Sequence, residues 1–340
     1  PKGHNVGKPY PVPFEEYYEN KGLDFLAFGD WGERRPESGQ FQVAEALHTW
    51  ANKDTLFIVN VGDNYYQKND SLPFNDPKDH EGVLSINDPK FQTYWLNVYQ
   101  GRLNKIYWYT VAGNHDWYTN LTAQVDYFWK KNIRFFFPSL YYVRRVYFGP
   151  NNNNLAVFIH IDTNPFYYKY KTYAEKDDMK RNLLVLNLNH KSKVEKRLKW
   201  IEDQLIAAQD ADWIFVVGHH PLVGACQTKH PSSYLMYKFP PLFKKYNVSA
   251  YIGGHMHDLE LSAANSTTSV TYFGVGGGGA KGTDTCGDAT WAAPYTFGFL
   301  RVNIPHGDIL YFDFIEANET DKPPHISCSG KVYSRKWHCK

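Results

Sequence analysis

The sequence predicts an α/β domain, because short apolar runs alternate with stretches of helical period. Its 340 residues are 43% hydrophobic, which is enough apolar material for a large core, in either one big domain or two small ones. The 37 lysines and arginines nearly balance the 35 acidic residues, and no apolar run approaches the roughly 20 residues of a membrane helix. These features favour a globular chain with no nucleic-acid surface and no stable membrane insertion.

Nine runs rich in β-branched or aromatic residues end in glycine or polar clusters and are predicted strands. They cover residues 23–28, 55–61, 106–111, 155–161, 213–217, 249–252, 269–275, 297–304 and 308–315. Helical patterns lie between several of them, at 38–52, 124–131 and, most clearly, 193–209. Because the sites of α/β proteins gather beyond the carboxyl ends of the strands, we expect the chemistry there.

The chain is predicted to form one catalytic domain over residues 1–340, without internal repeats or an obvious linker. Residues 1–22 are expected to be an N-terminal extension and 317–340 a C-terminal tail pinned by a disulfide. Residues 67–89, rich in Asp, Asn and Pro, are expected to be a long surface excursion.

Five predicted strands end in a glycine followed by a residue type that binds metals. The segments are Gly29-Asp30-Trp31-Gly32, Gly62-Asp63-Asn64-Tyr65-Tyr66, Gly113-Asn114-His115-Asp116, Gly218-His219-His220-Pro221 and Gly253-Gly254-His255-Met256-His257. One such segment alone is more typical of a helix cap or a structural hydrogen bond. Together they predict a metal centre, in which oxygen donors suit a hard ion and imidazoles suit a borderline divalent ion. Two unlike metals are therefore expected.

Glycine has two further expected roles near this centre. The glycines before the ligands should let the backbone turn sharply and leave room for substrate. The run from Gly274 to Gly279 formally fits a dinucleotide fingerprint, but residues 281–294 show no helical period. A flexible loop beside the metals is expected instead. His255 and His257 lie two residues apart, so an extended segment would point both the same way.

The order and content of the five segments resemble the metallophosphoesterases, and within them the short, tartrate-resistant type of purple acid phosphatase. Calcineurin-like relatives usually open with Asp-x-His, whereas Trp31 and Gly32 follow Asp30 here. The resemblance implies a four-layer α/β/β/α sandwich of two mixed β-sheets flanked by helices. It also implies an acid phosphatase that hydrolyses phosphate monoesters, with a binuclear centre that activates hydroxide for in-line attack.

The resemblance also assigns ligands. It places Asp30, Tyr66 and His257 on a ferric ion, Asp63 as a bridge, and Asn114, His219 and His255 on a second ion, which would be iron(II), zinc or manganese. A phenol of pKa near 10 binds a metal at acidic pH only where a strongly Lewis-acidic ion displaces its proton. A coloured ferric tyrosinate is therefore expected at Tyr66.

Three further histidines receive expected roles from the same resemblance. His115, oriented by Asp116, would protonate the leaving oxygen or hold the phosphate. His230 is similar to the second substrate histidine of the family, although its spacing is slightly long. His220 is expected to lie behind the ligands rather than to bind a metal. The implied substrates are small phosphate esters or phosphorylated proteins, with inorganic phosphate as product.

Other functions fit the same residues. The scaffold could act as a phosphodiesterase or nucleotide hydrolase, since loops choose the leaving group. A non-catalytic secreted metal-binding protein is another alternative, although it would need no acid beside its metals. Ferric iron could also support radical chemistry with peroxide.

Cysteines and glycosylation sequons point to an oxidising compartment. Cys226, Cys286, Cys328 and Cys339 allow three pairings, of which Cys226 with Cys286 and Cys328 with Cys339 is favoured over free thiols. Sequons occur at Asn69, Asn120, Asn247, Asn265 and Asn318. No basic-then-apolar leader follows Pro1, and a secreted, lysosomal or vacuolar location is expected.

Overall fold

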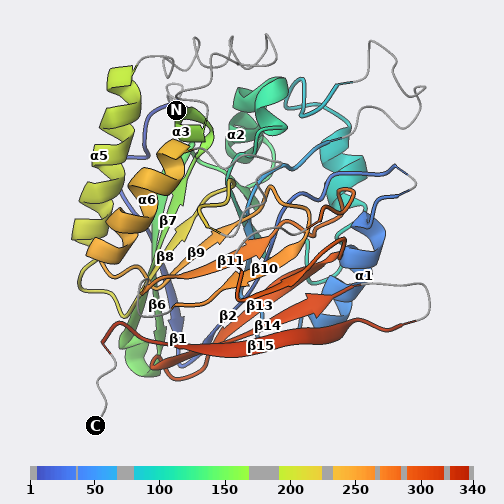
Figure 1. Ribbon diagram of the computed structural model, residues 1–340. Coiled ribbons are helices and arrows are strands. Elements are labelled where there is room, and N and C mark those ends of the chain that lie inside the picture. Colours follow the sequence, from blue (N-terminus) through green and yellow to red (C-terminus); the bar gives the residue numbers. More distant parts are fainter. Residues whose placement is uncertain are drawn as a thin grey trace.

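The computed structural model describes residues 6–35, 37–66, 80–167, 191–223, 233–264, 269–284, 289–317 and 322–336. Within these ranges the chain forms two mixed β-sheets that pack face to face, with helices on their outer surfaces (Figure 1). Phe25 of one sheet meets Phe158 and Phe215 of the other edge to face, at centroid distances of 5.5 and 5.9 Å. The predicted layers of helix, sheet, sheet and helix are thus confirmed.

The first sheet has eight strands and the second has seven. The first runs in the order β1 (Phe14–Glu19), β6 (Tyr141–Gly149), β7 (Asn154–Ile161), β8 (Trp213–Val217), β9 (Ala250–Gly253), β11 (Thr271–Val275), β10 (Leu259–Ser262) and β12 (Trp291–Ala293). The second runs in the order β15 (His325–Tyr333), β14 (Ile309–Glu316), β13 (Gly298–Ile304), β2 (Leu23–Phe28), β3 (Phe57–Asn60), β4 (Tyr107–Thr110) and β5 (Phe135–Phe136). All nine predicted strands are present, each within two residues of its predicted ends.

Parallel pairing dominates the centre of both sheets. Strands β7, β8, β9 and β11 run parallel in the first sheet, and β2, β3, β4 and β5 run parallel in the second. The central strands β2, β3 and β8 are buried along their whole length, which explains their continuous apolar sequences. The carboxyl ends of these strands therefore collect at one edge of the sandwich.

The helices cover the outer faces of the two sheets. They are α1 (Gln40–Trp50), α2 (Leu121–Lys130), α3 (Asn164–Tyr167), α5 (Lys191–Ala207) and α6 (Ser233–Lys245), with a π-helical turn η1 (Phe91–Leu96) and the short 3-10 turns η2 (Asp116–Tyr118) and η3 (Pro150–Asn152). Helix α5 contacts β7 of the first sheet, while α1 contacts β13 and α2 contacts β5 of the second. The three predicted helices correspond to α1, α2 and α5. Helix α6 escaped prediction because Pro240 and Pro241 interrupt its pattern.

The two chain ends contribute strands. Strand β1 pairs in parallel with β6, and β15 pairs antiparallel with β14. Both are edge strands whose exposure alternates along the chain, so they contain no continuous apolar run. Residues 14–19 and 325–333 are therefore integral parts of the sheets, within segments expected to be an extension and a tail.

The predicted partner of Cys328, Cys339, lies outside the described residues. Cys328 lies within β15 as a free thiol and packs partly against the hydrophobic core. Backbone pairing with β14 holds this segment in the sheet. Cys226, Cys286 and Cys339 lie outside the described residues.

Strand β6 was missed because it carries two arginines in its middle. Arg144 is fully buried, and its guanidinium donates to Glu16 Oε1 at 2.6 Å and to Glu16 Oε2 at 3.0 Å. It also lies over the rings of Tyr109 and Phe57, 3.0 and 4.2 Å from their centroids. A buried charge is tolerated only with such compensation.

His160 on β7 lies buried next to this charge. Its ring stacks on Tyr142 at 4.3 Å, and both burial and the charge of Arg144 lower the pKa of His160 well below its usual range. The folded protein thus keeps His160 neutral, whereas the unfolded chain protonates it below a pH of about 6.5. Folding stability is therefore present above that pH and is lost as the pH falls below it.

We expect His160→Phe to flatten this loss while retaining the stacked ring. One proton taken up only on unfolding costs about 1.4 kcal/mol of stability per pH unit. Between pH 6.5 and 5 the variant should lose about 2 kcal/mol less unfolding free energy than the parent protein. Denaturant melts at several pH values measure this. Equal slopes in the two proteins would contradict the assignment.

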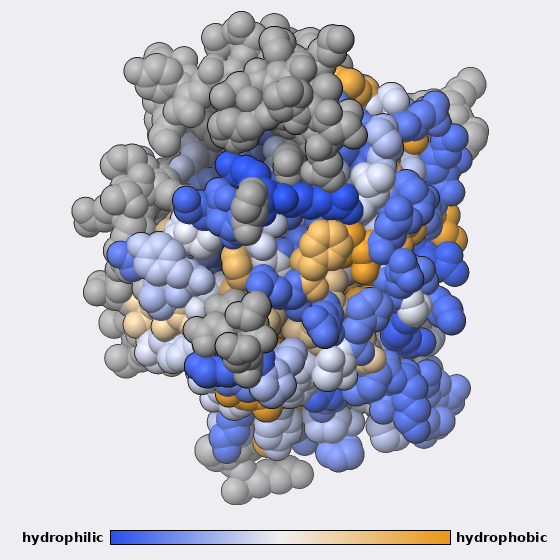
Figure 2. All heavy atoms as spheres, turned by 90° about the vertical axis from the view of Figure 1, so that its right-hand side faces the viewer, coloured by the Kyte–Doolittle hydropathy of each residue, from blue (hydrophilic) through white to orange (hydrophobic). Residues whose placement is uncertain are grey.

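Neither the face drawn in Figure 2 nor the described helices show a long apolar segment. In Figure 2 the coloured atoms are mostly hydrophilic, and hydrophobic residues occur in small groups. Within the described ranges, no helix combines the length and the apolar character needed to cross a bilayer.

Two of the predicted sequons fall within the described residues. Asn247 is exposed. Asn120 is half-buried and uses both ends of its side chain, since Nδ2 donates to Leu84 O at 3.0 Å and Oδ1 accepts from Ala123 N at 3.3 Å. Asn247 is thus the more accessible acceptor of the two. Asn69, Asn265 and Asn318 lie outside the described residues.

Candidate metal centre

Seven side chains predicted as metal ligands meet at the carboxyl edge of the two sheets. Asp30 follows β2, Asp63 and Tyr66 follow β3, Asn114 follows β4, His219 follows β8, and His255 and His257 follow β9. Parallel strands from both sheets thus deliver side chains from distant parts of the chain to one place.

Tyr66 is the centre of a first group of donor atoms. Its Oη lies 2.7 Å from Asp30 Oδ1, 2.7 Å from Asp63 Oδ2 and 2.9 Å from His257 Nε2. A phenol has one hydrogen, which cannot satisfy three partners. These spacings of 2.7 to 2.9 Å from Tyr66 Oη, and 3.5 Å between His257 Nε2 and Asp30 Oδ1, match the edges of a coordination shell with bonds of about 2.0 to 2.2 Å. The group therefore fits a metal ion better than a hydrogen-bond network.

A second group surrounds Asn114. Its Oδ1 lies 2.9 Å from His255 Nδ1 and 3.3 Å from His219 Nε2. His219 Nε2 is in turn 3.3 Å from Asp63 Oδ2. Asp63 Oδ2 therefore belongs to both groups, which is the position required of a carboxylate that bridges two ions.

The backbone is strained where it presents these ligands. Asp30, Asp63 and His255 have φ angles of 60°, 51° and 73°, in the left-handed region that residues with a side chain rarely adopt. Residues 255–258 form a bend rather than a strand. The expectation that His255 and His257 point the same way was therefore wrong, and each histidine joins a different group.

Glycines make room for neighbouring ligands. A Cβ on Gly113 would collide with Asp63 Oδ1, and a Cβ on Gly254 would collide with Asp30 Oδ2. The space that these glycines leave is thus filled by the carboxylate of another segment. Room for substrate was the expected reason, and interlocking of the ligand loops is the observed one.

Buried carboxylates make the site strongly attractive to cations. Asp30 and Asp63 are 0% and 1% exposed, and the charged partners that the structure shows for them are histidines. Burial opposes ionisation of Asp63, but the neighbouring His219 and His115 outweigh it and hold the pKa of Asp63 well below its usual range. Burial also opposes protonation of His219, yet the charges of Asp63 and Asp30 raise the pKa of His219 to about 9.

Tyr66 shows the complementary effect. Burial and the charges of Asp30 and Asp63 raise the pKa of Tyr66 well above its usual value. The phenolate can therefore form here only if a cation replaces the phenolic proton. The raised pKa of Tyr66 and the arrangement of donor atoms around its Oη thus both indicate a metal ion beside this residue.

Backbone carbonyls set which imidazole nitrogen faces the site. His219 Nδ1 donates to Val61 O at 2.9 Å, which leaves Nε2 toward Asp63. His257 Nδ1 donates to Lys281 O at 2.8 Å, and its backbone N donates to Thr283 Oγ1 at 3.0 Å. Such partners are typical of metal-binding histidines. Sequence reasoning missed them, because a carbonyl partner leaves no signal in residue type.

His115 lies at the open side of the site, but its partner differs from the prediction. Its ring packs on Tyr66 at 4.1 Å, its backbone N donates to Asp63 Oδ1 at 2.8 Å, and its side chain is 23% exposed. Its Nδ1 lies 3.5 Å from Glu81 Oε1, in the excursion after β3. Glu81 thus takes the place expected for Asp116.

Asp116 has a different task. It accepts hydrogen bonds from Gly113 N at 2.8 Å, Gln124 Nε2 at 2.8 Å and Asn64 N at 3.1 Å. Burial and the charge of Asp63 raise the pKa of Asp116 to about 6, against the lowering effect of these bonds. Asp116 therefore links the loop after β3 to the loop after β4, and both of its carboxylate oxygens already accept hydrogen bonds.

The glycine run after β11 lies beside the site, as predicted, but it is a packed element. Residues 276–279 are buried, Gly278 N donates to Gly29 O at 3.0 Å, and Ala280 N donates to Asp30 O at 2.8 Å. The run thus braces the turn that presents Asp30, and the expected flexible loop is replaced by close packing.

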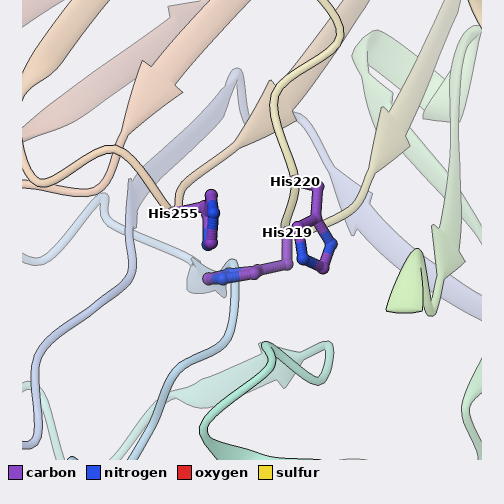
Figure 3. Close-up of side chains that lie close together, drawn as sticks. All are labelled: His219, His220 and His255. Carbon is purple, nitrogen blue, oxygen red and sulfur yellow. The ribbon is translucent and has the colours of Figure 1, made fainter. Parts of the chain in front are cut away.

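The two remaining predicted histidines differ in what can be said of them. His230 lies outside the described residues. His220 is fully buried, on the same loop as His219 and opposite His255 (Figure 3). One ring nitrogen of His220 lies within 4.8 Å of a ring nitrogen of each of those two residues. His220 therefore lies directly beside two of the predicted ligands.

Comparison with known proteins agrees with this geometry. The family model for calcineurin-like phosphoesterases matches residues 23–259. Tartrate-resistant acid phosphatase type 5 of Mus musculus is 31% identical over 75% of this chain and 72% of its own. Purple acid phosphatase 7 of Arabidopsis thaliana is 30% identical over 76% of this chain and 70% of its own.

Solved structures agree on the fold. GAP50, described as the anchor in the inner membrane complex of Plasmodium, has a TM-score of 0.73 at 23% identity, covering 93% of this chain and 90% of its own. The purple acid phosphatase PPD1 of Lupinus luteus has a TM-score of 0.59 at 14% identity, covering 95% of this chain and 55% of its own. The matched family model and the sequence relatives lead to one conclusion: the chain belongs to the calcineurin-like phosphoesterases, and within them to the purple acid phosphatases.

Proposed function

We propose that this protein is an acid phosphatase that hydrolyses phosphate monoesters at a centre of one ferric ion and one divalent ion. The ferric ion would lie among Asp30, Tyr66 and His257, and the divalent ion among Asn114, His219 and His255, with Asp63 between them. The divalent ion would be iron(II), zinc or manganese.

One observation carries this proposal. Asp63 Oδ2 lies 2.7 Å from Tyr66 Oη and 3.3 Å from His219 Nε2, so a single carboxylate oxygen belongs to both donor groups. The two groups also differ in chemistry. A buried phenol with two carboxylates suits a trivalent ion, whereas two imidazoles with an amide oxygen suit a divalent one.

When bound, the two ions would neutralise phosphoryl charge and lower the pKa of a coordinated water, the source of the nucleophile. The side chains of the protein would position the ester and donate a proton to its leaving oxygen. Asp30, Asp63 and His219 are buried, whereas the side chains of His115 and His257 are 23% and 14% exposed. An ester that approaches from the side of His115 and His257 would bring its leaving oxygen near His115.

His115 is proposed to protonate that leaving oxygen. Its Nδ1 faces Glu81, and its Nε2 lies 3.9 Å from Asp63 Oδ2 at the edge of the site. A carboxylate next to Nδ1 favours the tautomer with a proton on that nitrogen and stabilises the charged ring. His230 is proposed as a second phosphate-binding histidine.

A secreted, lysosomal or vacuolar location is part of the proposal. The exposed sequon at Asn247 supports it, since this side chain is accessible to glycosylation.

The proposal predicts the properties of the purified protein and of Tyr66→Phe. The parent protein should contain one iron and one divalent ion per chain, absorb visible light, and hydrolyse p-nitrophenyl phosphate in acid faster than bis(p-nitrophenyl) phosphate. Tyr66→Phe should lose the visible band, because the phenolate that gives rise to the charge-transfer transition is gone. Mass spectrometry, absorption spectra and initial rates measure the three properties.

Tyr65→Phe is the matched control. Tyr65 is the neighbouring buried tyrosine, whose ring packs against Phe91 and Trp31 away from the ligands. Its variant should keep both colour and metals. Faster diester hydrolysis would favour a phosphodiesterase, and metal binding without turnover would favour a binding protein. Colour retained in Tyr66→Phe would mean that another ligand produces it.

A further inference from the structure

Three imidazoles lie together on one side of the candidate metal centre. One ring nitrogen from each of His219, His220 and His255 lies within 4.8 Å of the other two. The ring centroids are 5.0 Å apart for His219 and His220, 5.2 Å for His219 and His255, and 4.8 Å for His220 and His255. Figure 3 shows the two loops bringing these rings around a shared space. Only two of these histidines are among the seven predicted ligands.

The surroundings of His220 hold its ring in a defined orientation. The ring is fully buried and stacks on Tyr167 at 4.0 Å with an interplanar angle of 17°. Tyr251 Oη donates to the carbonyl of His220 at 2.7 Å, which fixes the backbone. An immobile imidazole close to two others costs little further entropy on binding an ion.

Thr163 contacts the Nδ1 nitrogen of the His220 ring. Its Oγ1 lies 2.7 Å from His220 Nδ1 and accepts from His220 N at 3.2 Å. If Nδ1 also donates to this hydroxyl, Nε2 holds the lone pair. Metal-binding histidines typically have such a donor contact on their second nitrogen. Thr163 thus has the role for His220 that Val61 O has for His219.

We propose that His220 supplies a third imidazole to the divalent subsite, beside His219 and His255. The inference rests on the proposed function, because it presupposes an ion among these residues. Nitrogens on a shared zinc ion lie about 3.4 Å apart, so the three imidazoles, which now lie within 4.8 Å of one another, would have to draw together by up to about 1.4 Å as the ion binds. With Asp63 and Asn114, five side chains of the chain could then hold the divalent ion.

The proposed ligand changes which metal the subsite prefers. Imidazole suits zinc, iron and copper, whereas oxygen donors suit magnesium and manganese. A third nitrogen therefore shifts the divalent subsite toward zinc or iron(II) and away from manganese. Removing it should shift the preference back.

The test compares zinc binding in the parent protein and in His220→Phe, which keeps an aromatic ring against Tyr167. We expect zinc affinity at the divalent subsite, measured by competition with a chelator, to fall by about 10- to 100-fold. X-ray absorption at the zinc edge should count three imidazoles in the parent protein and two in the variant. Iron bound at the Tyr66 subsite should stay at parent levels.

Two further variants guard the interpretation. Thr163→Val leaves the imidazole in place but removes its hydroxyl partner, so it should weaken zinc binding in the same direction, and it remains informative if His220→Phe fails to fold. His160→Phe alters an equally buried histidine that the ligand groups do not include, and zinc binding should be unchanged. The same zinc affinity and imidazole count in the parent protein and in His220→Phe would overturn the inference alone. A parent protein that binds no divalent ion would overturn the proposed function as well.

Discussion

Replacing Asp63 with alanine is expected to remove both metal ions and with them the phosphatase activity. Its Oδ2 is shared by the Tyr66 group and the His219 group, so neither subsite remains complete without it. Loss of an outer partner alone typically weakens metal binding by about 10- to 100-fold, and a shared ligand should exceed that at both subsites. Metal analysis after dialysis against a weak chelator measures the loss for each ion separately.

Asp24→Asn is the matched control for this variant. Asp24 is a similarly buried carboxylate at the opposite end of β2, where it accepts from Arg301 at 2.9 Å. It should keep both metals, even if the protein loses stability. A chain that retains iron after Asp63→Ala would show that the two ions bind independently, and the bridging role would have to be abandoned.

His115→Ala is expected to separate metal binding from turnover. The side chain borders the site but is not among the seven proposed ligands, so both ions should remain. Loss of a general acid typically lowers the rate by about 10²- to 10⁴-fold. The loss in kcat should be larger for an alkyl phosphate than for p-nitrophenyl phosphate, because the alkoxide needs the proton more.

The two substrates also guard against an indirect effect. A merely displaced ligand loop would lower the rate on both substrates alike and would reduce the metal content. Normal metal content with the parental rate on both substrates would refute the role assigned to His115.

Much of the fold could be predicted because its central strands are buried on both faces. β2, β3 and β8 are nearly continuous apolar runs, because a strand that is buried on both faces needs apolar residues at almost every position. The strands that were missed obey other rules. β1 alternates between exposed and half-buried residues, and β6 contains Arg144, whose burial depends on Glu16 from a strand that the sequence does not bring near it.

The part of the site that could be predicted consists of side chains whose residue type is itself typical of metal binding. Asp, Asn, Tyr and His after glycine-ended strands identified the seven converging side chains. Backbone groups could not be predicted in this way, because every residue has them. The carbonyls of Val61 and Lys281, which orient His219 and His257, are examples. Glu81 was missed for a different reason. It lies in a long excursion whose path depends on tertiary packing, and the nearer acid in sequence, Asp116, turns away to hold the loops.

The left-handed backbone at Asp30, Asp63 and His255 lowers the stability of the folded protein at three positions that the proposed metal centre requires. Each such residue costs the native state on the order of 1 kcal/mol, and glycine would relieve that cost while deleting a ligand. At these three residues, a substitution that stabilises the folded protein is therefore also expected to abolish hydrolysis. A descendant that kept this scaffold for another purpose would gain robustness by changing them first.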